Sequence, residues 1–78
     1  MERRIARVVF PVHGLAWGGG GALTAERALA RTPGVLRAYV NPATEMAYVE
    51  FDYSTTTTKE LARAVADAGL HSGEPVLR

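Results

Sequence analysis

The chain has 78 residues, a formal net charge of +1 and no cysteine. The near balance of charges, without a long run of either sign, argues against nucleic acid as the main partner, and the lack of cysteine excludes disulfides, thiolate metal sites and cysteine catalysis. No stretch is apolar for long enough to predict a membrane span, and no signal peptide is expected. We therefore expect one cytoplasmic domain over residues 1–78, with its core in residues 4–77.

Residues 4–13 are predicted to form the first strand. Every second residue here is apolar, as the buried face of a strand requires. These residues are Ala6, Val8, Phe10 and Val12. Pro11 has no N–H to donate to a neighbouring strand. It is expected either at a bulge or at the last paired turn of the strand.

The segment after this strand is the candidate ligand or partner loop. Its members are His13, Gly14, Leu15, Trp17, Gly18, Gly19, Gly20 and Gly21. Glycine permits positive φ and close backbone approach, and the start of the following helix offers free N–H groups that could bind a phosphate. No lysine follows as it would in a P-loop, so a plain mobile loop is the alternative. Trp17 either anchors a partner or covers the end of the core.

A first helix is predicted over residues 22–31. Leu23, Ala25, Ala28 and Leu29 have helical spacing and are expected to face the core. Thr32-Pro33-Gly34 then ends the helix, because proline disfavours helical geometry in the residue before it and glycine permits a sharp exit.

Residues 35–41 and 46–52 are predicted to form a hairpin in which Asn41 faces Met46. This register gives the hairpin one apolar face and one polar face. The apolar pairs are Leu36 with Phe51, Ala38 with Val49 and Val40 with Ala47, and the other face pairs Arg37 with Glu50 and Tyr39 with Tyr48. A shift by one residue would disrupt both faces.

The last third of the chain predicts a second helix and a final strand. Thr57 and Glu60 form a capping box for a helix over residues 59–68, and Gly69 is expected as its C-cap. The residues expected to face inward are Leu61, Ala62, Val65, Ala66 and Ala68. Residues 70–77 form a final strand whose glycine and proline suit an edge.

The order strand-helix-strand-strand-helix-strand predicts a ferredoxin-like α+β fold. Its sheet is antiparallel in the order 4-1-3-2, and both helices lie on one face. The open face would then carry an apolar patch of Val9, Tyr39 and Tyr48, which is a candidate interface for a protein partner or a second copy of the chain.

Six short segments resemble a known family. They are Val12-x-Gly14-Leu15, Glu26-x-Ala28-Leu29, Pro33-Gly34-Val35, Ala38-x-Val40-Asn41, Ala47-x-Val49-x-Phe51-Asp52 and Leu61-x-x-Ala64-Val65-x-x-Ala68-Gly69-Leu70. In order and spacing over about residues 6–72 they resemble heavy-metal-associated domains. These are the small copper and mercury carriers and the N-terminal modules of metal-pumping ATPases.

The resemblance implies a metal loop that reads Gly-Met-Thr-Cys-x-x-Cys, whose two thiolates bind soft metal ions. Counting forward from Gly14 puts Trp17 and Gly20 at the cysteine positions, whereas counting back from Glu26 puts Gly18 and Gly21 there. Neither count supplies a ligand. The chain is thus similar to copper chaperones but lacks their metal motif, and we predict a non-enzymatic binding module that requires no cofactor.

Two alternatives remain open. His13 and His71 would lie at neighbouring strand ends, where two imidazoles suit zinc, copper(II) or nickel, or are simply surface residues. The loop after strand one and Asn41 are also similar to acylphosphatases, which use an arginine in that loop and an asparagine to orient water. Gly18 occupies the arginine position, and Asn41 before Pro42 suits a turn.

Overall fold

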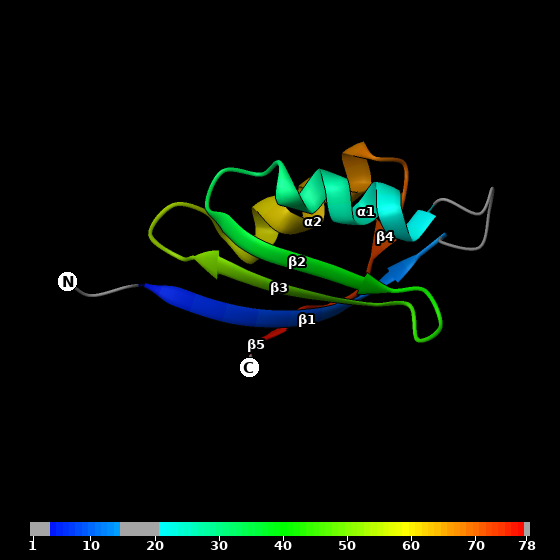
Figure 1. Cartoon of the computed structure of the whole chain (residues 1–78), viewed down its shortest axis with the longest axis horizontal. Coiled ribbons are helices and arrows are strands. Elements are labelled where there is room, and N and C mark those ends of the chain that lie inside the picture. Colours follow the sequence, from blue (N-terminus) through cyan, green and yellow to red (C-terminus); the bar gives the residue numbers. More distant parts are fainter. Residues whose placement is uncertain (1–3, 15–20, 78) are drawn as a thin grey trace.

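A computed structural model describes residues 4–14 and 21–77 of the chain. The elements are β1 (Ile5–His13), α1 (Gly21–Ala30), β2 (Val35–Asn41), β3 (Met46–Asp52), α2 (Thr58–Asp67), β4 (His71–Ser72) and β5 (Val76–Leu77). The sheet is antiparallel in the order β2-β3-β1-β4, and β5 also pairs with β1. Both helices cover the same face of it (Figure 1). The predicted ferredoxin-like fold and strand order are confirmed.

No helix in the described part of the chain is long and apolar enough to cross a membrane.

The core fills the space between this sheet face and the two helices. Residues of one parity on each central strand point into it, as the alternation predicted. Its buried members are Val8, Phe10, Val12, Ala25, Leu29, Val40, Ala47, Val49, Phe51, Leu61, Val65 and Leu70. Each larger aliphatic or aromatic side chain among them stabilises the fold by about 1.5–3 kcal/mol through removal of its surface from water.

Pro11 marks the point where β1 changes its partner. It is the last β1 residue paired with β3, opposite Met46, and the next residue pairs with Ser72 of β4. The Pro11 carbonyl accepts a hydrogen bond from the Gly73 N–H at 2.8 Å. The missing proline N–H therefore falls at the end of the β1–β3 ladder, the second of the two predicted placements.

The hairpin register is confirmed from Asn41↔Met46 to Arg37↔Glu50, but the predicted pairing of Leu36 is wrong. Val35 lies opposite Phe51, and a bulge follows before Arg37. The entry turn explains this, because the Asp52 N–H donates to the Gly34 carbonyl at 2.7 Å and so fixes the start of β2. One residue is then in excess between the two anchored pairs, and Leu36 is left 56% exposed.

The faces of the helices differ from prediction at two residues. The buried residues of α1 are Gly21, Ala25 and Leu29, whereas Leu23 is 51% exposed because it lies about 200° around the helix from Ala25. In α2, Ala66 was expected to face inward and is exposed. The inward stripe there is narrower, with Leu61 and Val65 buried one turn apart.

Helix α2 begins as predicted, whereas its C-cap and the last strand differ from the prediction. Thr57 is the N-cap, and its hydroxyl accepts from the Glu60 N–H at 3.2 Å, as the capping box predicted. Ala68, rather than the predicted Gly69, is the C-cap, and Gly69 follows it with φ of 87°. The single strand predicted over 70–77 is instead the two short strands β4 and β5, because Pro75 between them has no N–H for a ladder.

Strand β2 lies at an edge of the sheet and is tied to α1 by one side chain. The Glu26 carboxylate accepts a hydrogen bond from the Val40 N–H at 2.9 Å, in a partly buried position. Charged acceptors make stronger hydrogen bonds than neutral ones, so this contact fixes the helix against the end of the hairpin.

Candidate functional site

The glycine-rich loop begins and ends on described residues. Gly14 leaves β1 with φ of +97°, and a Cβ there would lie 3.1 Å from the Leu70 side chain. Gly21 is buried at the start of α1. Leu15, Trp17, Gly18, Gly19 and Gly20 lie outside the described residues, so the binding roles predicted for them stay predictions. The loop connects the edge of the β1–β4 ladder to the first turn of α1.

The structure brings the two histidines together. His13 and His71 are direct partners in the antiparallel β1–β4 pairing, and both are exposed. Directly opposite residues have Cβ atoms about 4.5–5.5 Å apart and point to the same side of the sheet. Among the described residues, no group of three or more His, Cys, Asp or Glu side chains is placed to hold a metal ion.

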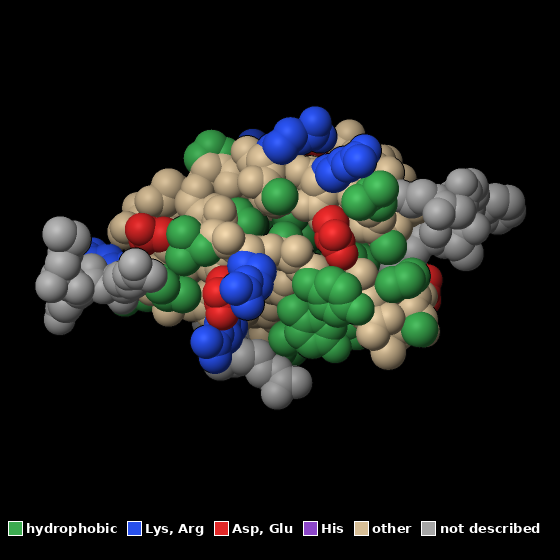
Figure 2. Space-filling model, in the orientation of Figure 1, with side chains coloured by type: hydrophobic (Ala, Val, Ile, Leu, Met, Phe, Trp, Pro, Cys, Tyr) green, Lys and Arg blue, Asp and Glu red, His purple; other side chains and the backbone are tan. Residues whose placement is uncertain are grey.

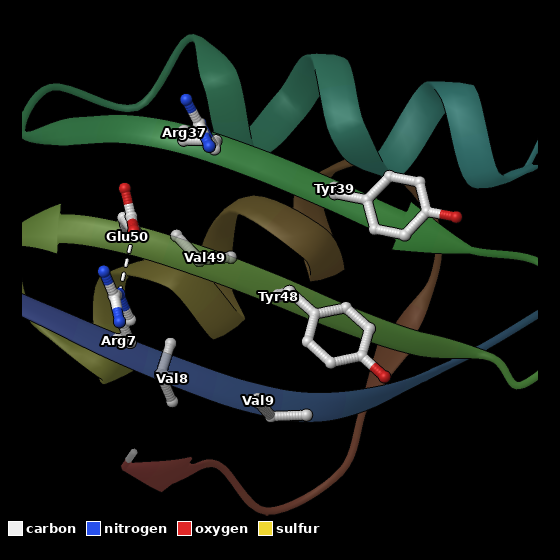
Figure 3. A pocket seen from close by; sticks show the side chains of 8 residues that line it. All are labelled: Arg7, Val8, Val9, Arg37, Tyr39, Tyr48, Val49 and Glu50. Atoms are coloured by element: carbon white, nitrogen blue, oxygen red, sulfur yellow. Dashed lines mark hydrogen bonds and ion pairs between the residues drawn. The ribbon is translucent and has the colours of Figure 1, made fainter.

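The open sheet face carries an apolar row that crosses three strands. Tyr39 pairs with Tyr48, and Tyr48 pairs with Val9. The two tyrosine rings stack with centroids 6.1 Å apart and an interplanar angle of 24°. Figure 3 shows the three side chains in line on the side of the sheet away from the helices. Val76 of β5 is the next partner along this row and is 61% exposed.

Figure 2 shows a compact group of hydrophobic side chains on this face of the molecule, with basic and acidic side chains beside it. Tyr39 is 51% and Tyr48 is 41% exposed, so both rings are available to a ligand while their stacking holds them in place. Of the three predicted interface candidates, Tyr39 and Tyr48 are therefore accessible, whereas Val9 is only 9% exposed and lies buried beside them.

A charged row runs parallel to the apolar row on the same face of the sheet, two residues along each strand. It consists of Arg37, Glu50 and Arg7, which are cross-strand partners in that order. The Arg7 Nε donates to a Glu50 carboxylate oxygen at 2.8 Å, so Glu50 is paired across β1 rather than with Arg37 as the hairpin register alone suggested. Arg37 has no ion pair within the described residues.

The two rows border a shallow groove of about 300 Å³. Val8 and Val49 complete its lining, and Figure 3 shows the charged side chains at one end of it and the tyrosines at the other. Arg7 was not among the candidate site residues predicted from the sequence. Its place in the groove depends on the β1–β3 register, and no local pattern in the sequence gives that register.

The alternative enzymatic site receives no support from Asn41. Its side-chain oxygen accepts a hydrogen bond from the Ala43 N–H at 2.9 Å, within the hairpin turn. This is the turn role that the asparagine before Pro42 predicted.

The metal chemistry of a CxxC loop does not fit this chain. The two thiolates of that loop select soft ions such as copper(I), and the sequence contains no cysteine. Neither a tryptophan nor glycine carbonyls can replace two thiolates. No step of thiolate metal exchange is therefore assigned to this chain.

Comparison with known proteins gives the same fold. No protein-family model matches the chain, and no curated protein matches its sequence. Oxidized MerP from Ralstonia metallidurans CH34 has a TM-score of 0.82 at 30% identity, over 88% of this chain and 94% of that one. The N-terminal domain of PacS from Synechocystis PCC6803 has a TM-score of 0.75 at 33% identity, over 86% and 92% of the two chains.

A third similar structure comes from a larger transporter. The N-terminal domain of a potential copper-translocating P-type ATPase from Bacillus subtilis, in its Cu(I)-loaded state, has a TM-score of 0.80 at 26% identity, over 87% of this chain and 84% of that one. These likenesses each cover more than four fifths of this chain, and the sequence segments predicted the same family. The chain belongs to the heavy-metal-associated domain family, as a member without the CxxC metal motif.

Proposed function

We propose that the chain acts as a single non-enzymatic, cytoplasmic domain that binds a protein partner on its open sheet face. The observation that carries this proposal is the pair of parallel rows, one aromatic and one charged, that border the groove. Tyrosine and arginine are the residues most often found at the energetic centre of protein interfaces.

The similar structures support a relation to metal carriers. They include the CopZ metallochaperone and the Cu(I)-loaded N-terminal domain of a potential copper-translocating P-type ATPase. Both bind or carry a metal ion as small domains of this fold, which favours a non-enzymatic role here. Because this chain has no cysteine, it shares the fold with them but not the metal ligands. The proposal therefore rests on the surface of this chain.

The charges of the groove favour an acidic partner over a second copy of the chain. Arg7 neutralises Glu50, which leaves the positive charge of Arg37 unmatched within the described residues. Two such faces brought together would place like net charges close to each other, whereas a carboxylate on a partner would complement Arg37. We therefore propose a partner segment with an aromatic or aliphatic side chain over the tyrosines and an Asp or Glu beside Arg37.

A display library of random peptides selected on the full chain tests this proposal directly. The enriched peptides should combine an apolar residue with an acidic one. Tyr48→Lys and Arg37→Glu should each weaken binding of a selected peptide about tenfold or more. Tyr53→Lys and Arg31→Glu are the matched controls, because Tyr53 is 57% exposed outside the groove and Arg31 is exposed after α1. Both controls should bind as the wild type does.

Two outcomes would contradict the proposal. Peptides that bind equally well to the Tyr48→Lys variant would show that the face is not the binding surface. Sedimentation of the chain alone as a dimer that dissociates on the same substitution would show that the face accepts a second copy instead of an acidic partner.

A further inference from the structure

The paired histidines lie on a rung of the β1–β4 ladder that is fixed from both sides. On one side, the Gly73 N–H donates to the Pro11 carbonyl at 2.8 Å. On the other side, the buried Leu70 side chain lies against the backbone of Gly14. The His13↔His71 rung stands between these two contacts, so neither strand can shift without breaking one of them.

The fit of Gly73 against Pro11 is close. A Cβ at Gly73 would lie 2.7 Å from the Pro11 Cγ and 3.0 Å from its Cδ. The proline ring is rigid, so it holds the β4 backbone at a defined distance from β1. The two imidazoles are thereby attached to a prearranged backbone, which lowers the entropy cost of binding a ligand with both at once.

We propose that His13 and His71 form a two-imidazole site for a divalent ion of borderline softness, with Cu²⁺ bound more tightly than Ni²⁺ or Zn²⁺. Imidazole nitrogen is a common ligand for these ions, at about 2.0–2.1 Å for zinc, and Cβ atoms about 4.5–5.5 Å apart allow both rings to reach one ion. The site uses nitrogen ligands on β1 and β4, whereas the family resemblance places its thiolates in the loop that follows β1.

The site supplies two protein ligands. Because the described residues offer no cluster of three or more ligand side chains, water or a ligand from a partner completes the coordination sphere. Both histidines are exposed, so such a ligand has open access to the ion. The proposal is independent of partner binding in the groove.

Calorimetric titration of the untagged full chain with CuCl₂, NiCl₂ or ZnCl₂ tests the site. We expect one ion per chain. Loss of either imidazole should lower the affinity about 100-fold, since the second imidazole binds the ion as part of the same molecule. The variants are His13→Ala and His71→Ala. A control that combines His71→Ala with Tyr53→His keeps two imidazoles in the chain but places them at opposite ends of the sheet, and it should bind no better than His71→Ala alone.

Copper-induced broadening of backbone NMR signals tests the same site in the wild-type chain, without reliance on variants that fold. Substoichiometric CuCl₂ should remove the signals around His13 and His71 together. Affinity that is unchanged in either single variant, or as high in the control as in the wild type, would overturn the proposal. So would broadening centred on any other part of the chain.

Discussion

Replacing Gly73 by alanine should detach β4 from β1, and the structure sets the size of the effect. The added Cβ would meet Pro11 Cγ at 2.7 Å, Cδ at 3.0 Å and Cβ at 3.2 Å, all of them atoms of a ring that cannot rotate away. The β4 backbone must therefore move outward, and the hydrogen bond from the Gly73 N–H to the Pro11 carbonyl is lost.

Overpacking of this kind costs about 1–3 kcal/mol, and the lost hydrogen bond adds about 1 kcal/mol. The smaller conformational freedom of alanine in the unfolded chain offsets about 0.4–1 kcal/mol of this. A net loss of about 1–3 kcal/mol remains.

Urea unfolding followed by circular dichroism measures this loss, and Gly69→Ala is the matched control. No atom lies within 4 Å of a Cβ at Gly69, but its φ of +87° is strained for alanine, so this variant reports the backbone cost without a clash. Gly73→Ala should also lower copper affinity as much as removal of one histidine does, while Gly69→Ala should leave it unchanged. A Gly73→Ala variant as stable as the wild type would refute the reasoning.

Four further substitutions test the fold. Thr56→Val should stabilise the chain by about 1 kcal/mol, because the buried Thr56 hydroxyl has no hydrogen-bond partner among the described residues. Thr57→Val should destabilise the chain by about 1 kcal/mol through loss of the α2 N-cap. The midpoints of urea unfolding measure both effects. Leu29→Ala should cost about 2–5 kcal/mol in the same assay, because Leu29 is fully buried, and a smaller loss would contradict the assigned core. Hydrogen bonds from the Ser54 hydroxyl and backbone N–H lower the pKa of Asp52 below its ordinary value of 3.8, so its contribution to stability is present above about pH 3.8 and is lost as the pH falls through the lower folded value. Asp52→Asn should remove that part of the acid dependence between about pH 2 and 5, and identical acid profiles for the two proteins would exclude the contribution.

Most of the fold could be predicted from local sequence patterns, because each of these patterns reflects a rule of backbone geometry or short-range contact. The Thr57 cap and the hairpin register at Asn41 depend on contacts between residues close in sequence, and the alternation in β1 follows from the two-residue repeat of any strand. The position of Leu36 could not be predicted in this way. It depends on the hydrogen bond between Asp52 and Gly34, which sets the start of β2 from outside the hairpin's own pattern.

The features of the candidate surfaces also differ in whether they depend on contacts that are near or far in the sequence. The stacking of Tyr39 on Tyr48 followed from the hairpin alone. The pairing of Glu50 with Arg7, which are 43 positions apart in the sequence, required the register between β1 and β3. The predicted neighbourhood of His13 and His71 followed from strand order, but their place on one fixed rung depends on the contact between Pro11 and Gly73.

The hydrogen bond from the Val40 N–H to the Glu26 carboxylate has a consequence for assembly. An edge strand such as β2 offers outward N–H groups on which another chain can add a strand, and continued addition leads to fibrils. Glu26 occupies one of these donors with a negative charge supplied by α1. An incoming strand would have to displace that carboxylate and leave it poorly solvated. The edge is thereby protected against sheet extension between copies of the chain.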